Sequence, residues 1–136
     1  MKLASQAEMS TYQYDNEAVH AVLMQRLQGK HRKPFSLSLC IDAEQFAGQV
    51  PKQQKPRLKD LKAEGAQIYI CKGMERGGSH HWKGAVLDRR LWFTGGLNLT
   101  EKSLRNTEMC MQMTGAVVQQ AVDALAVAQQ RGVLWQ

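Results

Sequence analysis

Apolar and polar side chains alternate along residues 35–41, which have the sequence Phe-Ser-Leu-Ser-Leu-Cys-Ile. A period of two places the apolar side chains on one face of an extended chain, so this segment is predicted to be a β-strand that ends at Asp42. Further strands are predicted over residues 66–71, 84–88, 91–94 and 107–113. In the last of these, Met109, Met111 and Met113 share one face, which we interpret as a core face rather than a ligand site.

Three segments have the apolar spacing of amphipathic helices. Residues 16–28 follow a good N-cap, Asn16, and form the first helix. Residues 57–64 form a short second helix. Residues 115–130 form a closing helix whose apolar stripe comprises Val118, Val122, Leu125 and Ala128.

The remaining segments have weaker patterns. Glycine and proline residues within residues 43–56 predict a mobile basic loop. Residues 1–14 are expected to be a flexible segment or a partial strand around Thr11–Tyr14. Strands that alternate with helices predict an α/β layered domain.

Composition narrows the class of protein. The chain has 136 residues, 43% of them hydrophobic, which suits one domain with one core. Its net charge of +6 favours a polyanionic partner such as nucleic acid, an anionic lipid surface or a phosphorylated small molecule. The sequence shows no signal peptide and no apolar segment of the length that spans a bilayer, so secretion is not expected.

The cysteines bear on metal binding and redox state. Cys40 and Cys71 lie in apolar runs and are predicted to be buried thiols, which suits a reducing compartment. The third cysteine is Cys110, and no C-x-x-C pair occurs. A structural zinc site is therefore not expected.

The candidate chemistry is concentrated in residues 79–88, Ser-His-His-Trp-Lys-Gly-Ala-Val-Leu-Asp. His81 and Lys83 are two positions apart, so an extended chain projects both to the same face. Asn98 follows a pair of glycines, where backbone can approach a ligand closely. An imidazole, an ammonium and an amide on one face suit a phosphate, because they supply a nucleophile or proton carrier, a positive charge and a neutral donor.

This spacing resembles the motif H-x-K-x4-D-x6-G-S-x-N of the phospholipase D superfamily, which the chain matches with unbroken spacing at His81, Lys83, Asp88, Gly95 and Asn98. Downstream, Asn106-Thr107-Glu108 resembles the family's N-x-E, whose carboxylate helps to orient the histidine. The resemblance covers roughly residues 15–130. It implies that residues 15–136 form a phospholipase D-like domain, a layered mixed sheet flanked by helices, with one motif-bearing half per chain.

The chain departs from the family pattern in two ways. Gly96 stands where the family usually has serine, which removes one hydroxyl donor near the phosphate. The backbone amide of Gly96 is expected to donate in its place, so weakened activity is expected. Family members also usually begin with a strand and a helix, of which the helix alone is clear here. A missing strand would leave a sheet edge open, as in a fragment or an inactive relative.

The resemblance implies a metal-independent hydrolysis, without a cofactor, that uses two motifs. One histidine attacks phosphorus and forms a phosphohistidine, while the second protonates the leaving oxygen and then activates water. One motif is found in this chain. Its similarity to single-motif bacterial endonucleases and mitochondrial cardiolipin hydrolases implies a homodimer that brings two copies of His81 together, either in the cytoplasm or at the mitochondrial surface.

The same resemblance suggests roles for individual residues. The candidate catalytic residues are His81, Lys83, Asp88, Asn98 and Glu108, and the candidate substrate-binding residues are His80, Gly95 and Gly96. Two alternatives stay open: Asp88 as an acceptor of backbone hydrogen bonds in a turn, and Glu108 as a solvated carboxylate. The substrate is a phospholipid such as cardiolipin or a nucleic acid. The alternative function is a weak or inactive family member that binds nucleic acid or anionic lipid.

Overall fold

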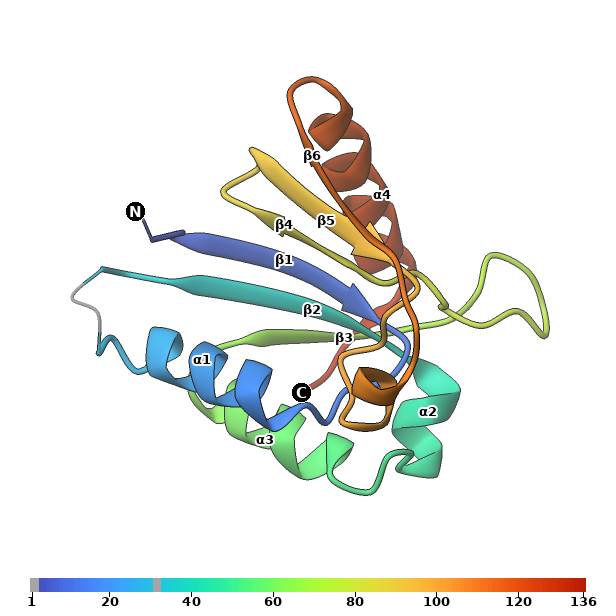
Figure 1. Cartoon of the computed structure of the whole chain (residues 1–136). Coiled ribbons are helices and arrows are strands. Elements are labelled where there is room, and N and C mark those ends of the chain that lie inside the picture. Colours follow the sequence, from blue (N-terminus) through green and yellow to red (C-terminus); the bar gives the residue numbers. More distant parts are fainter. Residues whose placement is uncertain (1–2, 31–32) are drawn as a thin grey trace.

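The structure is a computed structural model that describes residues 3–30 and 33–136. A seven-stranded sheet forms its centre, in the order β6-β5-β4-β1-β2-β3-β7 (Figure 1). Neighbouring strands pair in parallel from β1 through β2 to β3, and all other pairs are antiparallel. The strands are β1 (Gln6–Thr11), β2 (Ser36–Asp42), β3 (Gln67–Cys71), β4 (Gly84–Leu87), β5 (Leu91–Gly95), β6 (Cys110–Thr114) and β7 (Val133–Leu134). The predicted α/β fold with a layered mixed sheet is confirmed.

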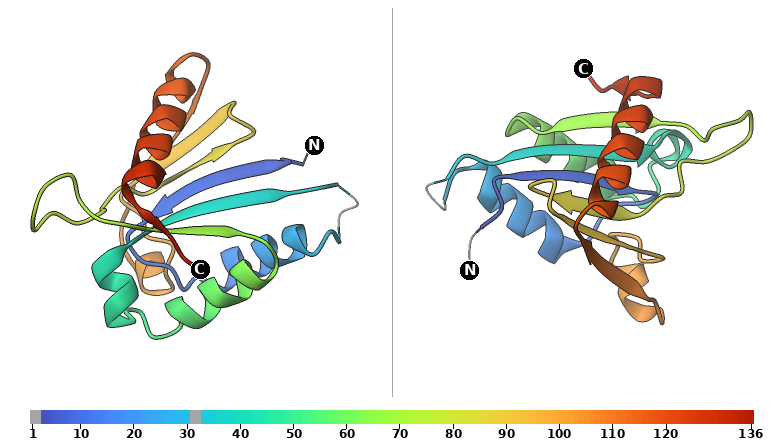
Figure 2. Two further views of the ribbon diagram at one scale, coloured as in Figure 1. Left: turned by 180° about the vertical axis from the view of Figure 1, so that it is seen from behind. Right: turned by 90° about the horizontal axis from the view of Figure 1, so that it is seen from above.

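Helices cover both faces of the sheet (Figure 2). The first face carries α1 (Glu17–Leu27) and α3 (Gln54–Ala63), and the opposite face carries α4 (Val117–Arg131). The predicted stripe of α4 packs on this second face, with Val118, Val122 and Leu125 buried and Ala128 partly buried. In the part of the chain that the structure describes, no helix combines the length and the apolar character needed to cross a membrane.

The N-terminal strand differs from the expectation. The partial strand expected at Thr11–Tyr14 is misplaced, because the strand is β1, Gln6–Thr11, which lies between β2 and β4. Both faces of β1 are covered, and its polar Glu8 and Ser10 are buried together with apolar neighbours. The segment therefore lacks the alternation that marks a half-exposed strand. The initial strand that family members usually have is therefore present as β1, and the open sheet edge that its absence would have caused does not arise.

The sequence predicts a loop over residues 43–56, but the structure shows that part of this segment is helical. These residues contain α2 (Ala43–Gly48) and the first turn of α3. The Asp42 carboxylate caps α2 by accepting hydrogen bonds from the amides of Glu44 and Gln45, both at 3.0 Å. Pro56 lies in the first turn of α3, where the missing N–H costs no intrahelical hydrogen bond.

The prediction of a strand over residues 107–113 with a buried methionine face is wrong in both the start of the strand and its burial. The strand begins at Cys110 rather than at Thr107. Met109 and Met111 are 75% and 52% exposed, so they are not core residues. The physical reason is topological: among residues 3–30 and 33–136, β6 is an edge strand that pairs with β5 alone, so one side of the strand is open to solvent in a single chain.

Candidate active site

A single buried carboxylate holds the start of the motif in place. Asp42 lies at the carboxyl end of β2 and is 1% exposed. While its Oδ1 caps α2, its Oδ2 accepts a hydrogen bond of 2.7 Å from the backbone amide of His80. The segment between β3 and β4, which carries His80 and His81, is thereby fixed at the end of the sheet where β1, β2 and β3 have their carboxyl ends (Figure 1).

His80 is directed inward. Its side chain is buried, and its Nε2 lies 2.7 Å from the Ser10 hydroxyl. Burial lowers the pKa of His80; Asp42 opposes this shift and Lys83 adds to it. His80 also lines, with His81 and Trp82, a cavity of about 380 Å³ between this segment and α4. The structure thus gives His80 contacts that hold the motif, alongside one wall of a cavity.

His81 and Lys83 are brought together, as their spacing predicts. The Lys83 Nζ lies 2.8 Å from the His81 Nδ1 and donates to the His81 carbonyl oxygen at 2.6 Å. His81 is exposed, whereas Lys83 is 6% exposed. Burial lowers the pKa of Lys83, and the nearby Glu108 carboxylate raises it. An exposed imidazole therefore lies beside a largely buried amine.

Tyr12 is a site residue that the sequence analysis missed. Its ring centroid lies 4.6 Å from that of His81, and the Lys83 Nζ lies 5.3 Å from its centroid. Its hydroxyl accepts a hydrogen bond of 2.8 Å from Gln45. Tyr12 belongs to no motif, but it directly follows β1, and the carboxyl ends of parallel strands are where α/β sheets bind ligands. That position was the available signal.

The two glycines allow close approach of backbone and of a carboxylate. A Cβ at Gly95 would collide with the backbone oxygen of Met109, so residue 95 has room only for glycine. A Cβ at Gly96 would meet the Glu108 carboxylate, the flexible end of a side chain. The Gly96 amide donates to the Met109 carbonyl at 3.4 Å, which corrects the expectation that it is free to replace the serine donor.

Glu108 and Asn98 are not hydrogen-bonded to His81 in the part of the chain that the structure describes. Glu108 accepts a hydrogen bond of 3.3 Å from the Asn106 side chain. The Asn98 Oδ1 is buried and has no hydrogen-bond partner within residues 3–30 and 33–136. The structure thus assembles His81, Lys83 and Tyr12 most closely, with Glu108 beside Gly96.

Comparison with known proteins identifies the family to which the chain belongs. Residues 2–128 match the protein family described as "Cardiolipin synthase, PLD-like domain". The chain belongs to the phospholipase D-like family. No match was found among curated proteins.

Solved structures of phospholipase D-like proteins have the same fold. Nuc from Salmonella typhimurium, a phospholipase D family member, superposes with a TM-score of 0.81 at 14% identity, over 99% of this chain and 84% of that one. NucT from Helicobacter pylori gives a TM-score of 0.79 at 15% identity, over 96% and 82%. Phosphatidylserine synthase from Haemophilus influenzae gives 0.72 at 12% identity, over 98% of this chain and 34% of that one.

The aspartate of the phospholipase D motif lies away from the other site residues. Asp88 directly follows β4, so the four residues of that strand lie between it and Lys83 and the two Cα atoms are about 16 Å apart along an extended chain. Its Oδ1 accepts hydrogen bonds from the Ser5 amide, the Ser5 hydroxyl and the Gln6 amide, at 2.8 to 2.9 Å. The structure therefore does not bring Asp88 to His81. It accepts backbone hydrogen bonds, which is the alternative left open for it, and joins the end of β4 to the start of β1.

Asp88 gives a pH-dependent prediction. Slight burial raises its pKa, but the hydrogen bonds from Ser5 and Gln6 and the charge of Arg90 outweigh this and leave the pKa below the usual 3.8. A carboxylate with a lowered folded-state pKa stabilises the fold above its unfolded-state pKa, and this contribution disappears as the pH falls through the folded-state value. Asp88→Asn should therefore unfold more easily at pH 7, by about 1 kcal/mol, and match the parent chain in strong acid.

Urea denaturation at a series of pH values measures this effect. The matched control is Asp123→Asn, because Asp123 lies on α4 and accepts from the Gln119 side chain alone among the described contacts. A stability gap for Asp88→Asn that stays constant down to strong acid would contradict the assignment.

Proposed function

We propose that this chain is a metal-independent phosphodiesterase that hydrolyses a phosphodiester through a phosphohistidine at His81, in a homodimer. The observation that carries the proposal is the exposed His81 imidazole with the Lys83 amine 2.8 Å from its Nδ1. The unbroken family spacing around this pair supports it. Nothing in the contacts favours one phosphodiester over another, so cardiolipin-like lipids and nucleic acids are both retained as substrates.

The proposed reaction has two displacement steps. A ring nitrogen of His81 attacks phosphorus, and the bond from phosphorus to the leaving oxygen breaks. The partner's His81 protonates that oxygen, then takes a proton from the water that cleaves the phosphorus–nitrogen bond. Lys83 and Asn98 are assigned to the non-bridging oxygens, where negative charge increases in the transition state. A bound phosphate competes with His81 for the Lys83 ammonium and so frees the imidazole to react.

Two features of the chain support a dimer. The chain supplies one motif, whereas the proposed reaction needs two histidines. The edge strand β6 and the residue before it expose Met111 and Met109, next to Glu108 and the glycine pair. A two-fold axis near this edge buries apolar surface and places two copies of His81 across one pocket.

A covalent trap tests the proposed function. The chain is mixed with bis-p-nitrophenyl phosphate, with a supercoiled plasmid or with cardiolipin vesicles, and quenched in alkali, in which phosphohistidine survives. Mass spectrometry should find the phosphoryl or phosphodiester adduct on the peptide that contains His81. Turnover without any adduct on this peptide would overturn the nucleophile assignment, and the substrate that gives adduct identifies the phosphodiester class.

Subunit mixing tests whether the active site is shared. If each site needs both histidines, an equimolar mixture with His81→Ala chains, after subunit exchange, should retain about one quarter of the parent activity per total chain. Independent sites would retain about one half. Light scattering on the parent chain gives the solution mass, and a strictly monomeric active enzyme would contradict the dimer.

One specific observation favours a second candidate function, binding without turnover. The Glu108 carboxylate occupies the space beside Gly96 where the family usually has a serine hydroxyl, and its negative charge opposes a phosphate. A well-folded dimer that binds the plasmid or cardiolipin vesicles in the trap experiment, yet gives neither turnover nor adduct, would establish this alternative.

A further inference from the structure

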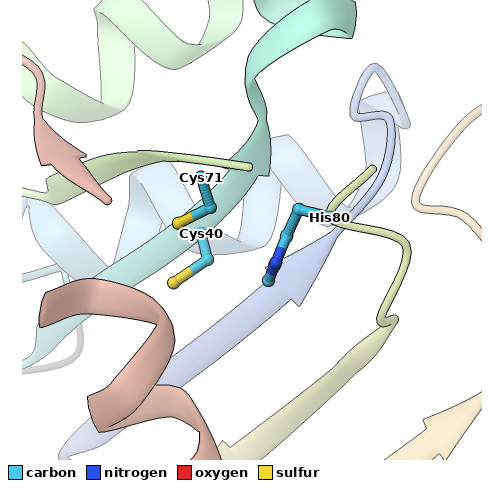
Figure 3. Close-up of side chains that lie close together, drawn as sticks. All are labelled: Cys40, Cys71 and His80. Carbon is cyan, nitrogen blue, oxygen red and sulfur yellow. The ribbon is translucent and has the colours of Figure 1, made fainter. Parts of the chain in front are cut away.

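Two cysteines and a histidine meet beneath the motif. One ligand atom from each of Cys40, Cys71 and His80 lies within 4.8 Å of the other two. The side chains come from β2, from β3 and from the segment that precedes β4, and they lie side by side in Figure 3. Sequence analysis missed this cluster because it looked for a local C-x-x-C pair, whereas these three residues come from segments far apart in the sequence.

We propose that Cys40, Cys71 and His80 form a binding site for a thiophilic divalent cation, of which zinc is the natural representative. Two thiolates and an imidazole are the ligand types that zinc prefers in proteins. Two thiolates also neutralise the charge of Zn²⁺, so the complex adds no net charge to a buried position. The site is distinct from the His81 imidazole and takes no part in the phosphodiester chemistry.

The hydrogen bonds of Ser10 prepare the imidazole for this role. The Ser10 hydroxyl donates its proton to the Trp82 carbonyl at 2.9 Å. It can then only accept from the His80 Nε2, which lies 2.7 Å away, so Nε2 carries the ring proton. The lone pair of Nδ1 is left for a ligand. Metal-binding histidines commonly have their second nitrogen fixed in this way.

The strand geometry favours a metal over a disulfide. Cys40 is paired with Tyr69 in the sheet, so Cys71 lies two residues further along β3. With strands about 4.8 Å apart and a rise of about 3.3 Å per residue, the two Cα atoms are about 8 Å apart. A disulfide requires less than about 7 Å. Tetrahedral zinc places its ligand atoms about 3.5 to 3.8 Å apart. Side-chain rotations that move the three ligand atoms by about 1 Å would bring them from within 4.8 Å to this spacing.

The surroundings supply an entry path and a consequence. Cys40 and Cys71 are 0% and 1% exposed, whereas His80 borders the cavity of about 380 Å³ beside α4. A cation enters from that cavity, and a water molecule there is its fourth ligand. The bound cation joins β2 and β3 to the segment whose next residue is His81. Its expected effect is to stabilise the fold and to hold the motif.

Cobalt provides a direct readout of this site. The full chain, purified with reductant and stripped of metal, is titrated with Co²⁺, whose tetrahedral thiolate complexes absorb in the near-ultraviolet and visible ranges. One equivalent of Co²⁺ should give both the near-ultraviolet and the visible bands, and added Zn²⁺ should abolish them. Zn²⁺ should also raise the midpoint temperature of thermal unfolding. A chain with reduced thiols and no such bands would overturn the proposal.

Variants locate the ligands. Cys40→Ser and Cys71→Ser should each lose the thiolate bands, and the matched control Cys110→Ser, at the exposed cysteine, should keep them. Ser10→Ala leaves all three ligands in place and should weaken binding by about 10-fold or more, because it frees the His80 ring. If the buried variants fail to fold, the parent titration and Ser10→Ala decide. Bands that survive in a folded Cys40→Ser chain, or that vanish in Cys110→Ser, would overturn the site.

Discussion

Replacing His81 with alanine is expected to lower the turnover of bis-p-nitrophenyl phosphate by at least about 10³-fold. The reason is that the phosphorus–nitrogen bond of the proposed intermediate can form at no other described group in the same position. Lys83, the nearest amine, is 6% exposed, and its Nζ donates to the His81 carbonyl, so it does not present a free nucleophile. Steady-state kinetics on the dimer, with the covalent trap alongside, measure both turnover and adduct.

The same substitution should leave the fold intact. His81 is exposed, and its described side-chain contacts are with Lys83 and the Tyr12 ring. The free energy of unfolding should therefore change by less than about 1 kcal/mol, as it does for substitutions of other exposed residues. His20→Gln is the matched control, because His20 lies on α1 and contacts Tyr14 and Asp60 away from the motif. His81→Ala with near-parent turnover would remove the nucleophile from the proposal.

The sequence predicted those parts of the fold in which local pattern and burial agree. The strand β2 alternates because one of its faces packs under α1 and α3, and the stripe of α4 is continuous because that helix covers a single face. β1 was misplaced because both of its faces are covered and its buried polar residues, such as Glu8, obscure the pattern. Met109 and Met111 were misjudged because alternation reports one shared face, not whether anything covers it.

The site was predictable along the chain but not across it. The spacing of His81 and Lys83 fixed their contact, since two residues of one extended segment share a face. Tyr12, Ser10 and Asp42 reach the motif through the parallel pairing of β1 and β2, which no local spacing encodes. Asp88 illustrates the converse case: its motif position is met, yet the length of β4 places its carboxylate with Ser5 rather than with the imidazole.

Replacing Asp42 with alanine is expected to lower both stability and turnover. The substitution leaves three backbone amides without their acceptor, those of Glu44, Gln45 and His80. Two of these amides belong to the first turn of α2, which Asp42 caps. Loss of a cap and of a charged, buried acceptor should reduce the free energy of unfolding by about 3 kcal/mol. The His80 backbone is then free to shift, and a displacement of about 1 Å at His81 is enough to cost about 10²-fold in turnover.

Asp42→Asn separates these two effects. An asparagine Oδ1 still caps α2, so about two thirds of the lost stability should return, because Asn and Asp are similarly good N-caps. Its Nδ2 cannot accept from the His80 amide, so kcat measured well below the unfolding midpoint should stay low while KM changes little. Glu44→Ala, which removes a carboxylate from the first turn of α2 but not the cap, is the matched control. If Asp42→Asn instead restores kcat along with stability, Asp42 supports the fold alone and does not position the motif.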